Sequence, residues 1–219
     1  PLAVIEDAAC ALGATCDGLR CGSDSQLACL SFHPRKIITT GEGGAVLTHD
    51  AALAARLRRL RNHGRDDQGT FVDLGGNSRL SELAAALGRA QLARLDAMLE
   101  RRLALAARYR ERLGPCPALE LQQAPPGTGH NYQTFALCLR APLSRRAVMA
   151  GLAARGVQSG PATFAVHRER PYAGQRAAVR GPLPVADRLA EQALALPLHH
   201  RLSHDDVDRV CDALLALLG

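Results

Sequence analysis

Three short, mainly apolar runs limit the folds open to this chain more than any other feature. They cover residues 2–5, 27–32 and 45–48, and each is followed by polar or glycine-rich residues. Continuous apolar character over so few residues is typical of buried strands in an α/β sheet. The first run ends at Glu6 and Asp7, and ligands sit at the carboxyl edge of strands in open α/β sheets. We therefore expect a mostly parallel sheet with a site at this edge.

Helical patterns follow these runs along the chain. We expect a helix capped by Asp50 to run to about residue 62 with Gly64 as its stop, and the longest helix to run from Ser81-Glu82 to about residue 113. A Pro/Gly-rich stretch follows at 114–129. An α+β pattern then comprises a strand at 132–139, a helix at 144–155, a loop to 184 and a helix at 185–193. A last helix at 207–217 is capped by residues 203–206, beginning with Ser203. These patterns predict two domains, residues 1–105 and 106–219, divided inside the long helix.

Lys36 is the only lysine among 27 Lys and Arg residues. In a chain that uses arginine for positive charge, a retained lysine suggests a task that a guanidinium group cannot perform. Covalent chemistry is such a task, because a neutral amine attacks a carbonyl and forms a Schiff base. The alternative is that the lysine lies at a solvated position without a chemical role.

Charge and cysteine content narrow the class of protein. The formal charge of +6 comes from arginines spread through helical segments, which are typical of solvated helix faces rather than of a nucleic-acid surface. The seven cysteines form no pattern with zinc spacing, so we expect no metal and predict reduced thiols in a cytoplasmic protein. No segment is long and apolar enough to predict a membrane span.

Three residues at the predicted strand ends suit pyridoxal phosphate. That cofactor needs a lysine for a Schiff base, a carboxylate beside its pyridine nitrogen, and hydroxyl or backbone N–H groups around its phosphate. Lys36, Asp7 and Ser31 supply one group of each kind at one edge of the sheet. An Asp at a strand end is also a common cap or turn residue. The three residues together are therefore stronger evidence for a cofactor site than any one of them alone.

The residues around these positions resemble the DegT/DnrJ/EryC1/StrS aminotransferases, which act on nucleotide-linked keto-sugars. The similarity covers essentially the whole chain, and its motifs lie at 4–14, 31–44, 61–64, 76–83, 156–159, 167, 184–186 and 196–198. It implies an α/β fold like that of aspartate aminotransferase (fold type I), with part of the large pyridoxal-phosphate domain followed by a small α+β domain. It also implies a homodimer.

The resemblance implies a role at each matching position. Lys36 would form the Schiff base and then move a proton between the substrate and the cofactor. Asp7 would pair with the pyridinium nitrogen and Ser31 with the phosphate. Asn77 would reach the phosphate in the neighbouring subunit, so that the active sites are shared.

Three further positions are implied less directly. Cys10 would lie beside the cofactor ring, where the family usually has Gln or another polar residue that hydrogen-bonds better than a thiol. His33 and His167 would contact substrate or support the site, although a turn residue satisfied by the backbone explains His33 equally well. The stretch 160–166 lacks the Arg and aromatic residues common in the family, so the sequence does not predict the sugar.

The resemblance predicts an aminotransferase that moves an amino group from glutamate to a keto-sugar nucleotide. Dehydratases of the family carry His where this chain has Lys36, which favours transamination. The first half of the family's large domain has no counterpart here, so we expect a C-terminal portion of the enzyme. Two alternatives stay open: a family member acting on a keto-cyclitol, and a truncated, non-catalytic homologue with a partner or regulatory role.

Overall fold

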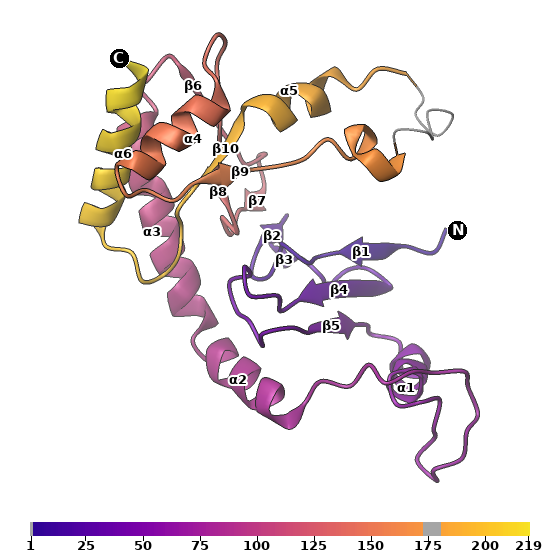
Figure 1. The fold of residues 1–219 in the computed structure, drawn as a ribbon. Helices are drawn as coiled ribbons and strands as arrows, with labels where there is room; N and C mark the ends of the chain where they lie inside the picture. Colours follow the sequence, from indigo (N-terminus) through magenta and orange to yellow (C-terminus); the bar gives the residue numbers. More distant parts are fainter. Residues whose placement is uncertain (1, 173–180) are drawn as a thin grey trace. The chain divides into compact units, whose positions relative to one another are not determined.

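The computed structural model of the chain describes residues 2–172 and 181–219 and contains two compact units (Figure 1). The first comprises residues 1–100 and 124–133, and the second residues 101–123 and 134–219. They divide inside one helix, between Glu100 and Arg101. Residues 173–180 of the loop expected before residue 184 lie outside the described part.

The main sheet of the first unit contains β1 (Ile5–Asp7), β4 (Leu27–Ser31) and β5 (Gly44–Leu47), in the order β1-β4-β5. β1 and β4 are parallel, with Asp7 opposite Cys29, whereas β4 and β5 are antiparallel. The expectation of a mostly parallel sheet is therefore wrong for the described strands. The reason lies in residues 32–43, which fold back on themselves when the Phe32 N–H bonds the Gly43 carbonyl oxygen at 2.9 Å, so the chain re-enters beside β4.

β1 also begins later than predicted, and its acidic residues lie within the strand. Glu6 accepts hydrogen bonds from the Gly22 N–H at 2.9 Å and the Ser25 hydroxyl at 3.1 Å. A second small sheet, in the order β3-β2-β7, joins β2 (Thr15–Cys16), β3 (Leu19–Arg20) and β7 (Thr128–Gly129). The pairing of β2 with β7 brings residues 124–133 back to the first unit.

Helix α1 (Ala51–Leu60) starts as predicted, because the Asp50 side chain accepts from the Ala52 and Leu53 N–H groups. It ends before residue 62, and the chain turns away at Gly64, whose φ is +76°. A side chain at Gly64 would place its Cβ 1.7 Å from the Asp73 carbonyl oxygen, so both the dihedral angle and the packing require glycine.

The single long helix predicted to start at 81–82 is wrong, because the structure has two helices there. Ser81 caps α2 (Glu82–Leu92), and α3 (Leu95–Leu113) follows after a turn. The Arg94 N–H bonds the Gln91 carbonyl, three residues back instead of four. A tertiary contact holds the end of α2: the Gln91 side chain accepts from the Thr39 N–H at 3.2 Å and donates to the Thr39 carbonyl at 2.6 Å. After the turn, Leu95 and Met98 are buried with Ile37 and Ile38.

The second unit is built on a four-stranded antiparallel sheet in the order β6-β8-β10-β9. Its strands are β6 (Leu119–Leu121), β8 (Phe135–Leu139), β9 (Gly160–Pro161) and β10 (Ala193–Leu196). Sequence patterns missed β10, which pairs on both sides and so has continuous apolar character without alternation. The ring of Tyr109 from α3 stacks on Phe135, with ring centroids 4.6 Å apart.

Three helices accompany this sheet: α4 (Arg145–Ala154), α5 (Pro184–Gln192) and α6 (His204–Leu218) (Figure 1). Ser144 caps α4, although the sequence pattern had placed it inside that helix. Ser203 caps α6 with a capping box, as the sequence predicted. Two short 3-10 turns, Val166–Arg168 and Arg170–Tyr172, lie in the loop after β9.

Candidate active site

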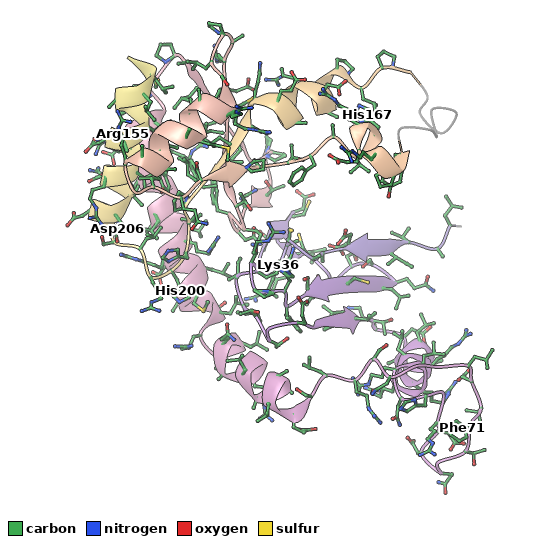
Figure 2. All side chains as sticks on the ribbon, viewed as in Figure 1. Lys36, Phe71, Arg155, His167, His200 and Asp206 are labelled. Carbon is green, nitrogen blue, oxygen red and sulfur yellow. The ribbon has the colours of Figure 1, made fainter. Side chains whose placement is uncertain are left out.

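The loop between β4 and β5 carries Lys36 (Figure 2). The Lys36 N–H bonds the His33 carbonyl at 2.9 Å and closes a turn. Directly after it, Ile37 and Ile38 are only 6% and 3% exposed and pack in the apolar cluster of the first unit. The lysine side chain is partly exposed, but its backbone is tied to a buried anchor. A fixed backbone limits where the amine can go, which is the arrangement that a covalent lysine needs.

Cys10 comes from the segment after β1 and meets this lysine. The Lys36 Nζ atom lies 2.8 Å from the Cys10 Sγ atom. Cys10 is exposed, and Ala8, two residues earlier, is fully buried. The structure therefore brings together two of the predicted site residues that are 26 positions apart in the sequence.

Asp7 and Ser31 lie at the carboxyl ends of neighbouring parallel strands. Asp7 is opposite Cys29, and Ser31 is the last residue of the same strand β4. The Asp7 Oδ1 atom accepts from the Ala9 N–H at 3.1 Å, so one lone pair is used locally while the carboxylate stays exposed. The two residues thus share one edge of the sheet, as the strand pattern predicted.

His33 follows Ser31 and is engaged with its own loop. Its N–H donates to the Ser31 hydroxyl at 3.3 Å, and its Nδ1 accepts from the Arg35 N–H at 3.2 Å. Its Nε2 lies 3.9 Å from a Glu42 carboxylate oxygen. These contacts are those of a turn residue, which is one of the two interpretations of His33. A contact between His33 and a substrate stays a proposal.

Asn131 and Gln133 hold the Cys10 and Lys36 segments in place, and sequence reasoning did not find them. Asn131 is 5% exposed, and its Nδ2 donates to the carbonyl oxygens of Cys10 and Leu12 at 2.9 and 3.0 Å. Gln133 Nε2 donates to the Arg35 carbonyl at 2.6 Å, and Gln133 Oε1 accepts from the Ile37 N–H at 3.1 Å. We call these two residues the amide clamp.

The clamp is itself internally bonded. The Asn131 side-chain oxygen accepts from the Gln133 N–H at 3.0 Å. Between them Tyr132 has a φ of +46°, and its N–H donates to His130 Nδ1 at 2.9 Å. Burial lowers the pKa of His130, which favours the neutral imidazole that can accept this bond. The available signal is a run of four polar or aromatic residues at 130–133, of which the predicted strand at 132–139 includes only the last two.

Two predicted site residues lie elsewhere. Asn77 is exposed and pairs with Asn62 in an isolated bridge beside α1. His167 belongs to the second unit, where its Nε2 lies 3.0 Å from an Asp187 carboxylate oxygen (Figure 2). Within the described residues, the recorded contacts of both residues therefore do not include Lys36.

The chemistry of the first-unit residues fits pyridoxal phosphate. An accessible primary amine, an exposed carboxylate at a parallel strand end and a serine hydroxyl on the next strand are the groups that this cofactor requires. Over residues 2–172 and 181–219, no group of three or more His, Cys, Asp or Glu side chains is placed to hold a metal ion. No helix in the same residues combines the length and apolar character needed to cross a membrane.

Comparison with known proteins gives consistent matches. The model of the DegT/DnrJ/EryC1/StrS aminotransferase family matches residues 1–215. The dTDP-3-amino-3,4,6-trideoxy-alpha-D-glucose transaminase of Streptomyces venezuelae is 39% identical over 97% of this chain and 56% of its own length. The GDP-perosamine synthase of Caulobacter vibrioides is 38% identical over 97% of this chain and 58% of its own length.

The structural match agrees with these relatives. The crystal structure of S. venezuelae DesV in complex with a ketimine intermediate superposes with a TM-score of 0.89 at 39% identity, over 99% of this chain and 58% of that chain. The chain thus spans less than two thirds of the length of each of these matches.

Proposed function

The chain belongs to the DegT/DnrJ/EryC1/StrS aminotransferase family, and from this membership we propose that it forms part of a pyridoxal-phosphate-dependent aminotransferase of nucleotide sugars. The amino group would come from glutamate and pass to a keto-sugar carried by a nucleotide. The observation that carries the proposal is the position of Lys36, the only lysine of the chain, in the loop at the sheet edge of Asp7 and Ser31. The relatives that act on nucleotide-linked sugars support the substrate class.

Each residue has a defined task in this proposal. Lys36 would hold the cofactor through its amine, and the freed Nζ would then accept and release the proton that moves during amine transfer. Pyridoxal phosphate, when bound, supplies an electron sink for the carbon that loses this proton. Asp7 would keep a proton on the ring nitrogen, Ser31 would bind the phosphate, and Cys10 would lie beside the ring.

The tasks of the two units follow from the same proposal. Residues 1–105 would belong to the large cofactor-binding domain and residues 106–219 to the small domain. His33 and His167 would serve the substrate side. Asn77 would bind the phosphate in the neighbouring subunit of a homodimer, for which its exposure in this chain is a requirement.

Borohydride trapping on the full-length protein tests the role of Lys36. Incubation with pyridoxal phosphate and tritiated borohydride should place label on the peptide that contains Lys36. The Lys36→Arg variant should take up no label there and show no transaminase activity. Arg56→Gln, an exposed change on α1, is the matched control and should behave like the parent protein. Label elsewhere in the chain, or full activity in Lys36→Arg, would refute the proposal.

A substrate panel tests the reaction. With glutamate as donor, turnover of keto-sugar nucleotides supports the proposal. Turnover of keto-cyclitols alone would show that the substrates are cyclitols instead of nucleotide sugars, with the cofactor chemistry unchanged. Shared sites are tested by mixing inactive Lys36→Ala and Asn77→Ala subunits. Partial recovery of activity is expected, and no recovery after demonstrated subunit exchange would remove Asn77 from the partner's site.

A further inference from the structure

The contact between Lys36 and Cys10 joins a nucleophilic amine to an oxidisable thiol. Their Nζ and Sγ atoms are 2.8 Å apart, and Cys10 is exposed, so a small reagent reaches the sulfur from solvent. Thiols that are accessible oxidise first to sulfenic acid, and a sulfenic acid condenses with a nitrogen nucleophile when one is adjacent. The amine of Lys36 is such a neighbour.

The backbone on both sides of this contact is fixed. Asn131 holds the Cys10 carbonyl, and Gln133 holds the residues before and after Lys36. Because the amide clamp connects the two segments, neither side chain has to reorganise the backbone to reach the other. Proximity of this kind raises the rate of a condensation relative to the same groups free in solution.

The other exposed cysteine and the two buried cysteines lack this arrangement. Cys16 is also exposed, but its recorded polar neighbour is the Asp17 carboxylate at 3.9 Å, which is not a nitrogen nucleophile. Cys138 and Cys211 are buried, and burial raises the pKa of Cys211 to about 12 and that of Cys138 in the same direction. Cys10 is therefore distinguished by its partner, and Cys16 is its matched control.

We propose that Cys10 and Lys36 form a redox-sensitive pair that a hydroperoxide converts into a sulfur–nitrogen cross-link. In the first step the Cys10 sulfur takes the terminal oxygen of the hydroperoxide, the O–O bond breaks, and the alcohol or water leaves. In the second step the Lys36 nitrogen attacks this sulfur, the S–O bond breaks, and hydroxide leaves with a proton from the amine as water. The sulfur is oxidised by two electrons and the hydroperoxide is reduced by two.

The cross-link is reversible and has a functional consequence. Two equivalents of a small thiol restore the Cys10 thiol and the Lys36 amine and leave as a disulfide. While the bond exists, the Lys36 nitrogen cannot bind a carbonyl group. On the proposed function, on which this consequence alone rests, oxidation blocks covalent attachment of the cofactor until the pair is reduced.

Peptide mapping of the full-length, cofactor-free protein after treatment with hydrogen peroxide tests the cross-link. Trypsin normally cleaves after Lys36, but a modified lysine resists cleavage. The expected product joins the peptide that ends at Arg20 to residues 36–56, with a mass about two hydrogens below the sum of the two peptides. Dithiothreitol should remove it. Cys16→Ser should keep the product, whereas Cys10→Ser and Lys36→Arg should lower it at least about tenfold.

Two results would overturn the proposal: oxidation of Cys10 directly to sulfinic acid without the linked peptide, or a linked peptide that survives Cys10→Ser. Borohydride trapping with pyridoxal phosphate, measured on the same samples, separates the two hypotheses. Trapping on Lys36 without a peroxide cross-link refutes the redox pair alone. A cross-link in a protein that never traps the cofactor refutes the proposed function alone.

Discussion

Replacing Asn131 with alanine tests whether the amide clamp orders the site. The substitution removes two hydrogen bonds to the carbonyls of Cys10 and Leu12 and one from the Gln133 N–H, at a position that is 5% exposed. Each bond contributes about 0.5–1.5 kcal/mol net, and partners left buried without a bond cost more, so we expect a loss of about 2–4 kcal/mol.

Hydrogen exchange followed by mass spectrometry measures this loss where it occurs. The backbone N–H groups of residues 10–14 should exchange about 30- to 1000-fold faster, which corresponds to the same free energy. Thr128→Ala is the matched control, since it removes a single hydrogen bond, to the Pro125 carbonyl, that is more exposed and lies in the same segment 124–133. It should change the exchange rates of residues 10–14 by less than about tenfold. Protection of residues 10–14 within threefold of the parent protein in Asn131→Ala would refute the role of the clamp.

Three further predictions follow from single positions. In urea unfolding, Gly64→Ala should lower the free energy of unfolding by more than ~3 kcal/mol, because the added Cβ would lie 1.7 Å from a backbone oxygen. Gly69 has a similar φ but no atoms near the position of a Cβ, so Gly69→Ala should lower the same free energy by only about 1 kcal/mol. Hydrogen bonds from the N–H and hydroxyl of the N-cap serine lower the pKa of Asp206 to about 2, so the stabilisation of α6 by this carboxylate should be complete above about pH 4 and be lost towards pH 2. Acid titration followed by circular dichroism should show a smaller loss in Asp206→Asn. A titration curve identical to that of the parent protein would contradict this prediction. Burial raises the pKa of Cys211 to about 12, so iodoacetamide at pH 8 should label Cys16 in the folded protein but Cys211 only after unfolding.

Local signals predicted the helix starts and the strand that carries the site. The caps at Asp50 and Ser203 are confirmed, and helices begin next to Ser81 and Ser144 as expected, because a side chain that bonds the first turn acts within three residues of its own position. The strand expected at 27–32 is confirmed as β4 with one residue fewer. The wrong expectations concern longer distances: the direction of β5, the break before α3 and the missed strand β10 each depend on a partner that the local pattern does not contain.

The candidate site shows the same division. The sequence by itself identified Lys36, Asp7 and Ser31 as chemically suitable groups, because residue type and position after an apolar run are local properties. Only the tertiary structure placed the Cys10 sulfur 2.8 Å from the Lys36 amine and assigned Asn131 and Gln133 to hold the two segments. The Cys10–Lys36 contact spans 26 residues, and the amide contacts of Asn131 and Gln133 span 121 and 98. An amide can bond any backbone group that folding brings within reach. The groups that suit the proposed chemistry were therefore encoded locally, and their arrangement was decided by packing.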